Sequence, residues 1–209
     1  MNEAEARREI VAVGRRLYER NLIVATDGNI SARLDDGRLL FTRTGLCKGD
    51  LGENDLVVLE SPDKWRQTTG LSSEAPMHLE AYRRRPDVNA VIHAHPPYAV
   101  ALSLAGIDLD DKLLPELILT LGEVPTAPFA APCSIEGSEA IKGLIDKHDT
   151  LILYRHGALT VGSSLREALW KMERLEFAAQ VTYLALMLSE LKPLTEDQVD
   201  RILEVRNRI

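Results

Sequence analysis

Residues 88–97 read Val-Asn-Ala-Val-Ile-His-Ala-His-Pro-Pro, an apolar and partly β-branched run that ends in two prolines. Such a run predicts a buried strand, because these side chains favour extended backbone and the prolines stop further pairing. Alternate side chains of a strand point to the same face, so His93 and His95 project together. Two adjacent imidazoles at a strand end suit a shared divalent ion, and they equally suit hydrogen-bonded core histidines.

Short extended segments and helices alternate on both sides of this strand. Asp36-Gly37 is a typical hairpin turn between two of the segments. Because several strand pairs are hairpins, we expect one α/β domain over residues 1–209, with helices on both faces of a mixed, mostly antiparallel sheet. Such a fold has three layers, α/β/α. Strands are expected at residues 30–33, 39–42, 56–59, 88–95, 124–129, 151–155 and 158–161, and helices at residues 3–20, 72–85, 97–104, 135–147, 164–191 and from 195 onward.

The composition narrows the class of protein and of partner. The chain has 209 residues, of which 45% are hydrophobic and 27% charged, and its formal net charge is −7. This balance is typical of a globular protein with a full core, and it disfavours nucleic acid and membranes as partners. Cys47 and Cys133 form no disulfide pattern, and no apolar leader is present. We therefore expect a cytoplasmic protein.

A third histidine follows another predicted strand. His156 comes directly after the segment 151–155, so it lies at a strand end, as His93 and His95 do. A catalytic zinc commonly keeps three protein ligands and one open position, which these three histidines can supply. His148 stands in a polar stretch and is expected in solvent.

Ser72-Ser73-Glu74 opens the helix predicted at residues 72–85. Exposed N–H groups and hydroxyls at a helix N-terminus bind anions such as phosphate. A glutamate beside a metal can ligate the ion or move a proton at the substrate. The same residues also fit an ordinary capped helix with an acid in its first turn. His78 follows Glu74 by one helical turn, which fits a supporting contact behind the metal ligands, and a surface position is expected.

Two further turns are rich in small hydroxyl and amide side chains: Thr26-Asp27-Gly28-Asn29-Ile30-Ser31 and Thr42-Arg43-Thr44-Gly45. Each turn can present backbone N–H groups to an anion, and each is equally a plain hairpin connection. Neither turn is a P-loop or a dinucleotide-binding fingerprint.

Together, these residues form five separated motifs. They are Gly28-Asn29-Ile30-Ser31, Thr44-Gly45, Ser72-Ser73-Glu74, His93-Ala94-His95-Pro96 and His156-Gly157. In this order and spacing the chain resembles the class II aldolase/adducin family over nearly its whole length. Within that family the likeness is to L-fuculose-phosphate aldolases.

The resemblance implies a metal-dependent enzyme with the class II aldolase-like fold. It implies that His93, His95 and His156 hold one Zn²⁺ per subunit, with Mn²⁺ or Co²⁺ as alternatives. Glu74 is then the acid/base, and it ligates the ion before substrate enters. The resemblance also implies a homotetramer with active sites near the subunit interfaces. The residues implied to take the substrate phosphate are Gly28, Asn29, Thr44, Gly45, Ser72 and Ser73.

The implied reaction is the reversible cleavage of a ketose 1-phosphate such as L-fuculose 1-phosphate. Its products are dihydroxyacetone phosphate and a small aldehyde such as lactaldehyde. Zinc polarises the carbonyl and stabilises the enediolate, and Glu74 delivers a proton to it. The alternatives are a sugar-phosphate epimerase, dehydratase or decarboxylase on the same scaffold, and a non-catalytic adducin-like interaction domain.

One segment departs from the aldolases. These enzymes carry a tyrosine, a proton donor to a neighbouring subunit's site, where this chain has no tyrosine between Tyr98 and Tyr154. Glu116 lies near the place where dehydratase relatives have a catalytic glutamate. It is a candidate second acid, and it equally fits a surface position.

Overall fold

The structure is a computed structural model that describes residues 1–109 and 111–206. A seven-stranded sheet has the order β3-β2-β1-β4-β7-β6-β5. Neighbouring strands are antiparallel, except that β5 and β6 are parallel. The predicted mixed, mostly antiparallel sheet is therefore confirmed. The strands are β1 (Asn29–Arg33), β2 (Leu39–Thr42), β3 (Leu56–Leu59), β4 (Ala90–Ala94), β5 (Thr126–Ala127), β6 (Thr150–Leu153) and β7 (Gly157–Gly162).

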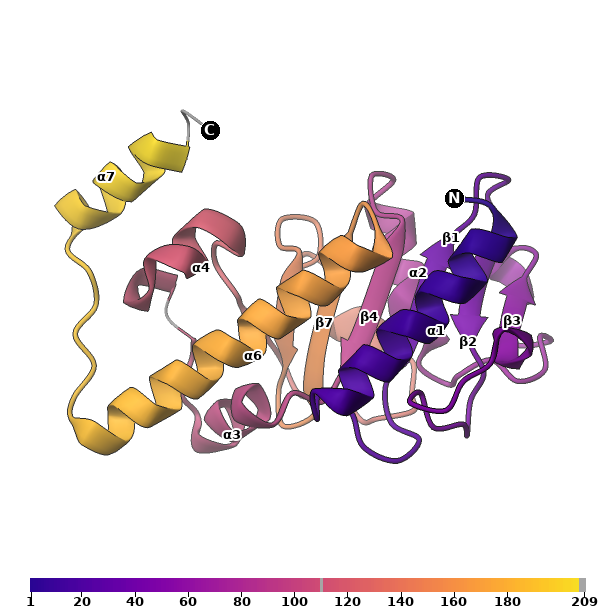
Figure 1. Ribbon diagram of the computed structural model, residues 1–209, viewed down its shortest axis with the longest axis horizontal. Coiled ribbons are helices and arrows are strands. Elements are labelled where there is room, and N and C mark those ends of the chain that lie inside the picture. Colours follow the sequence, from indigo (N-terminus) through magenta and orange to yellow (C-terminus); the bar gives the residue numbers. More distant parts are fainter. Residues whose placement is uncertain (110, 207–209) are drawn as a thin grey trace.

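Helices cover both faces of the sheet. Figure 1 shows α1 and α6 running side by side across one face, with α2 on the opposite face. α5 packs against α2, so the predicted three layers are confirmed. The helices are α1 (Glu3–Glu19), α2 (Ala75–Arg84), α3 (Pro97–Ala105), α4 (Pro115–Thr120), α5 (Glu136–Ala140), α6 (Leu165–Leu188) and α7 (Glu196–Arg206), with short 3₁₀ turns η1 (Glu53–Asp55), η2 (Pro62–Lys64) and η3 (Asp111–Leu113).

α6 is the longest helix, and Ser164 caps it by accepting a hydrogen bond from the Glu167 N–H. Its C-terminal part extends beyond the sheet, and α7 lies next to α4 at that end of the molecule (Figure 1). In the described part of the chain, no helix combines the length and the apolar character needed to cross a membrane.

Two hydrophobic cores lie on the two faces of the sheet, and β4 contributes to both. Ile92 and its alternate neighbours pack in the core that includes α1 and α6. Val91 packs in the other core, with Met77 and Ala81 of α2. Burying a side chain such as Ile92 contributes about 1.5–3 kcal/mol. The alternation places His93 on the same face as Val91, which is the face that α2 covers.

Two predicted elements are shorter than expected. The helix expected at residues 135–147 is α5 followed by turns, because Gly143 takes a left-handed conformation with φ of 80°. The strand expected at residues 124–129 is only the two-residue β5. Pro125 and Pro128 flank β5, and a proline lacks the N–H that a ladder needs. α4 was not expected from the sequence.

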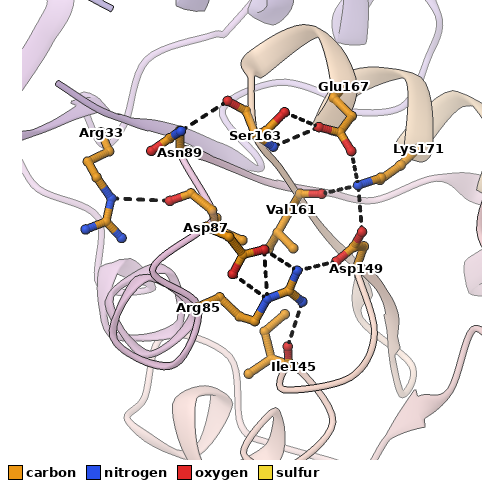
Figure 2. Close-up of polar contacts among 11 residues, drawn as sticks. Arg33, Arg85, Asp87, Asn89, Ile145, Asp149, Val161, Ser163, Glu167 and Lys171 are labelled. Carbon is orange, nitrogen blue, oxygen red and sulfur yellow. Dashed lines mark hydrogen bonds and ion pairs between the residues drawn. The ribbon is translucent and has the colours of Figure 1, made fainter. Parts of the chain in front are cut away.

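A network of charged side chains closes the end of the sheet where β4 begins and β7 ends (Figure 2). The ammonium of Lys171 lies 2.8 Å from an oxygen of Asp149 and 2.6 Å from one of Glu167. Arg85 lies 2.9 Å from the other Asp149 oxygen and also pairs with Asp87. Lys171 also donates to a β7 carbonyl, so every charge in this network has a partner.

Candidate functional site

The three predicted histidines meet at the opposite end of β4. His93 is the residue before the last one of β4, His95 follows the strand directly, and His156 lies in the turn before β7. Their ring centroids are 4.8–5.0 Å apart, and one ligand atom from each lies within 4.8 Å of the others. Gly157 permits this approach, because a Cβ there would lie 2.4 Å from the Ala94 carbonyl oxygen.

The backbone fixes how the central ring is presented. His93 Nδ1 lies 3.0 Å from the Ala158 carbonyl oxygen and donates to it, so the lone pair is on Nε2. That Nε2 lies 3.1 Å from Nε2 of His95. Burial and the imidazoles of His95 and His156 hold the pKa of His93 well below its usual range. The ring is therefore neutral, which is the form that ligates a metal.

Glu74 faces the histidines from the start of α2. One carboxylate oxygen lies 3.3 Å from His93 Nε2, and the other lies 3.4 Å from His156 Nε2. Burial lowers the pKa of His156, although Glu74 opposes that shift. Asn29 donates to Glu74 at 2.9 Å and so fixes the carboxylate.

The expected cap of α2 was wrong in detail. Glu74 itself occupies the N-cap position, and its side chain makes no capping hydrogen bond. Ser72 instead accepts from the Glu74 N–H at 3.2 Å. Because the Glu74 carboxylate is not used as a cap, it is free to face the histidines.

A divalent cation fits this donor set. Two ligands of a tetrahedral ion with bonds of 2.0–2.1 Å are about 3.3 Å apart. Three of the observed separations are close to that value: 3.1 Å between the Nε2 atoms of His93 and His95, 3.3 Å from His93 Nε2 to Glu74, and 3.4 Å from His156 Nε2 to Glu74. Three imidazoles with one carboxylate are also ligands that zinc and similar ions prefer.

A cavity of about 430 Å³ opens beside the histidines. Asp27, whose carboxylate lies 3.4 Å from His95 Nδ1, stands where the cavity meets the histidines. All six residues expected to take a phosphate line the same cavity, although three segments of the chain supply them. They are Gly28, Asn29, Thr44, Gly45, Ser72 and Ser73.

Two cations in the cavity wall were missed by the sequence reasoning, which expected neutral donors alone. Arg43 and Lys48 line the cavity with the serines and threonines. Arg43 stands inside one of the turns singled out from the sequence, so its position was visible there. Lys48 gave no signal, because the carbonyl that binds its ammonium belongs to Thr26, far along the chain.

A second, mainly apolar pocket adjoins the cavity and shares Glu74 and His156 with it. Residues 128–134 form much of its wall, and Met77 and Leu153 close it. Tyr154 also lines this pocket, and none of the lysines and arginines within residues 1–109 and 111–206 does. Glu74 and His156 therefore lie between a polar cavity and an apolar pocket.

The remaining candidate residues lie elsewhere. Glu116 is exposed on α4 and lines neither the cavity nor the apolar pocket of its own chain. His148 is partly buried, 3.9 Å from Glu123. The surface position expected for His78 was wrong: the residue is fully buried, and Ser31 lies 2.7 Å from its Nδ1. Burial lowers the pKa of His78 to about 3.

Comparison with known proteins places these motifs in a family. Residues 8–183 match the model of the class II aldolase and adducin N-terminal domain. The chain is 33% identical over 202 residues to a 3-oxo-tetronate 4-phosphate decarboxylase of Pectobacterium atrosepticum, covering 95% of this chain and 92% of that protein. It is 34% identical over 182 residues to an L-fuculose phosphate aldolase of Methanococcus vannielii, covering 86% and 96%.

A solved structure agrees with these matches. The crystal structure of YgbL from Klebsiella pneumoniae superposes with a TM-score of 0.85 at 33% identity, over 97% of this chain and 99% of that one. The family model spans all five motifs, including the histidine triad that suits a divalent metal. The chain belongs to the class II aldolase and adducin family.

Proposed function

We propose that the protein is a zinc-dependent lyase that acts on a phosphorylated sugar acid or sugar and releases dihydroxyacetone phosphate. The observation that carries this proposal is the cluster of three imidazoles facing Glu74, with a cavity of hydroxyl, N–H and cationic donors beside it. When bound, a zinc ion supplies Lewis-acid stabilisation of the negative charge that develops on the substrate carbonyl oxygen.

The residues of the chain divide the remaining work. Gly28, Thr44, Gly45, Ser72 and Ser73 hold the substrate phosphate in the cavity. Asn29 lines the same cavity and also holds Glu74 in place by its hydrogen bond. Glu74 passes a proton to the carbon that has lost its bond, a transfer worth about 10²–10⁴-fold in rate.

The first candidate reaction is decarboxylation of a 3-oxo acid phosphate such as 3-oxo-tetronate 4-phosphate. The bond between the carboxylate carbon and C2 breaks, its electron pair moves toward the neighbouring carbonyl, and carbon dioxide leaves. One proton is taken up, and the product is dihydroxyacetone phosphate. This step needs no base for the leaving group.

The apolar pocket beside Glu74 favours this first candidate. No lysine or arginine in the described part of the chain lines that pocket. A carboxylate within it is therefore poorly stabilised, whereas neutral carbon dioxide needs no counter-charge. The decarboxylase of Pectobacterium atrosepticum, which matches 95% of this chain, supports the same reaction.

The second candidate is aldol cleavage of L-fuculose 1-phosphate or a similar ketose 1-phosphate. Here a base must take a proton from the hydroxyl of the departing aldehyde. Tyr154, which lines the apolar pocket, is one group that can serve. Glu116 of a neighbouring subunit is another, if the protein is a homotetramer. Exposed apolar side chains on α6, such as Phe177 and Met187, support an assembly of subunits.

Incubation with each substrate tests the function and separates the two reactions. Dihydroxyacetone phosphate is measured by its coupled enzymatic reduction. Carbon dioxide and lactaldehyde are measured in the same reactions. We expect product with one metal ion per chain and loss of turnover in Glu74→Gln and after chelation. Turnover that survives both treatments contradicts the proposal. Product from only one substrate identifies the leaving group, and the mass of the assembly in solution tests the tetramer.

A further inference from the structure

We propose that Arg43 is the residue that selects a dianionic phosphate group in the cavity, and that Lys48 only holds the surrounding turns in place. This inference rests on the proposed function in one respect, namely that the substrate carries a phosphate. It assigns to two cations in one cavity two different roles, binding and positioning.

The side chain of Arg43 lies across the rim of the cavity. It stands between the end of β2 and the turn at Thr44, and it lines the cavity together with Ser72. Its guanidinium lies over the backbone of Gly70, where an added Cβ would be 2.6 Å from Nη1. The Thr44 N–H donates to the Gly70 carbonyl at 2.9 Å, which ties these two segments together. The guanidinium is therefore placed between two segments that carry phosphate-binding residues.

This guanidinium has no protein partner. Within residues 1–109 and 111–206, no hydrogen bond or ion pair involves the Arg43 side chain. The two carboxylates of the cavity are engaged elsewhere, because Asp27 faces His95 and Glu74 faces the other histidines. Arg85 at the far end of the sheet, by contrast, pairs with both Asp87 and Asp149. A planar fork of free donors among hydroxyls and N–H groups suits a phosphate, which accepts two parallel hydrogen bonds.

Lys48 lines the same cavity, but its charged group is buried and already has protein partners. It is only 2% exposed, and its ammonium donates to the Thr26 carbonyl at 2.6 Å and to the Leu46 carbonyl at 2.9 Å. Burial lowers the pKa of Lys48, and the charge of Asp27 opposes that shift. The Lys48 side chain thus joins the turn before β1 to the turn after β2, which together supply three of the six phosphate-binding residues.

Charge balance favours phosphate as the partner of Arg43. The chain has a net charge of −7, so a dianion that enters the cavity needs a local cation as well as neutral donors. A substrate carboxylate is a poor alternative partner, because an ion pair that stabilises it before bond cleavage opposes the loss of carbon dioxide. The guanidinium therefore belongs with the phosphate end of the substrate.

Binding of two simple anions tests this proposal without any turnover. Methyl phosphate is a dianion at pH 8, and methyl sulfate has the same shape with one charge. Titration calorimetry on the metal-loaded protein compares wild type with Arg43→Met, Arg43→Lys and the control Arg66→Met, whose exposed side chain stacks on Trp65 outside the cavity. We expect Arg43→Met to weaken methyl phosphate binding about 10-fold or more, because a charge-assisted pair is lost. Its preference over methyl sulfate should shrink, and Arg43→Lys should recover only part of the loss.

Two results overturn the proposal. One is an Arg43→Met variant that binds methyl phosphate as wild type does. The other is an equal loss in Arg66→Met, which shows a long-range charge effect rather than a contact. Activity then separates this inference from the proposed function. If wild type turns over and Arg43→Met keeps its KM, the role of Arg43 fails and the function stands. If no substrate reacts but Arg43→Met loses methyl phosphate, the anion site stands and the function fails.

Discussion

The two ends of β4 treat charged and titratable groups in opposite ways. Where the strand begins, Arg85, Asp149 and Lys171 form a network in which every charge meets its opposite (Figure 2). Where it ends, His93 and His95 lie side by side, with ring nitrogens 3.1 Å apart. The two regions share one strand and one sheet, so the difference lies in what each set of side chains still needs.

Side chains of opposite charge that pair with one another contribute to folding. Imidazoles that lie next to one another lack such partners and gain them when a ligand binds. Burial and neighbouring imidazoles lower the pKa of His93, so this ring resists protonation and is not stabilised by the other imidazoles beside it. A divalent cation satisfies all members of the cluster at once. We therefore expect the residues at the start of β4 to contribute to stability, and the histidines at its end to bind a ligand.

Removing a histidine should have the largest effect. In His156→Ala we expect the bound metal to fall from about one per chain toward none. Activity should fall about 10³-fold, because a metal contributes several kcal/mol to the barrier and each 1.36 kcal/mol is tenfold. Elemental analysis and turnover measure both. The control His148→Ala should keep its metal, and a metal-loaded His156→Ala contradicts the assignment.

Disrupting the charge network at the start of β4, the paired end, should lower the free energy of unfolding and leave metal binding unchanged. Lys171→Met removes the buried ammonium, and we expect the free energy of unfolding to fall by about 1–3 kcal/mol, because Asp149 and Glu167 keep other partners. Urea denaturation at one protein concentration measures this, and metal content should not change. In the exposed pair with Glu139, Lys142→Met should cost about 0.5 kcal/mol or less. Equal effects in both variants contradict the distinction.

Acid should weaken the two ends in separate pH ranges. Burial lowers the pKa of His78, which is neighbour to the cluster, from 6.5 to about 3. The unfolded chain therefore binds a proton below pH 6.5 that the folded protein refuses, and the free energy of unfolding falls by about 1.4 kcal/mol per pH unit. This loss continues until the pH approaches 3.

The carboxylates of the paired end lose their stabilising effect only at lower pH. Burial raises the pKa of Glu167, but hydrogen bonds from Lys171 and Ser163 outweigh burial and lower it to about 2. Its stabilisation is complete above pH 4.5 and is lost between pH 4.5 and 2. Denaturation of the metal-free protein between pH 7 and 5 gives the unfolding free energy as a function of pH. Compared with wild type, this dependence should be shallower in His78→Asn and unchanged in Glu167→Gln. A steeper or equal slope in His78→Asn contradicts this order.

Local patterns in the sequence predicted most of the sheet and the meeting of three histidines. Alternation along β4 placed His93 and His95 on one face, and the strand before His156 placed the third histidine at the same edge. Asp36-Gly37 gave the β1–β2 hairpin, in which the Gly37 N–H bonds the Leu34 carbonyl. These features depend on residues close together in the chain, so periodicity and turn chemistry suffice.

What escaped prediction depends on partners that are distant in the chain. His78 is buried because Ser31 of β1 lies beneath α2, and nothing within the helix shows this. Lys48 is buried because the Thr26 carbonyl, 22 residues earlier in the chain, accepts a hydrogen bond from its ammonium. The prediction of a helix at residues 135–147 was wrong for a local reason. It gave the spacing of apolar residues more weight than the two glycines within the segment, which disfavour a helix.

The central place of β4 has a consequence for synthesis of the chain. β4 pairs with β1, which precedes it, and with β7, which follows about 60 residues later. A nascent chain that has not yet reached Gly157 presents two bare imidazoles and an open strand edge, which invites pairing with another chain. β7 must therefore be synthesised before the three histidines can meet.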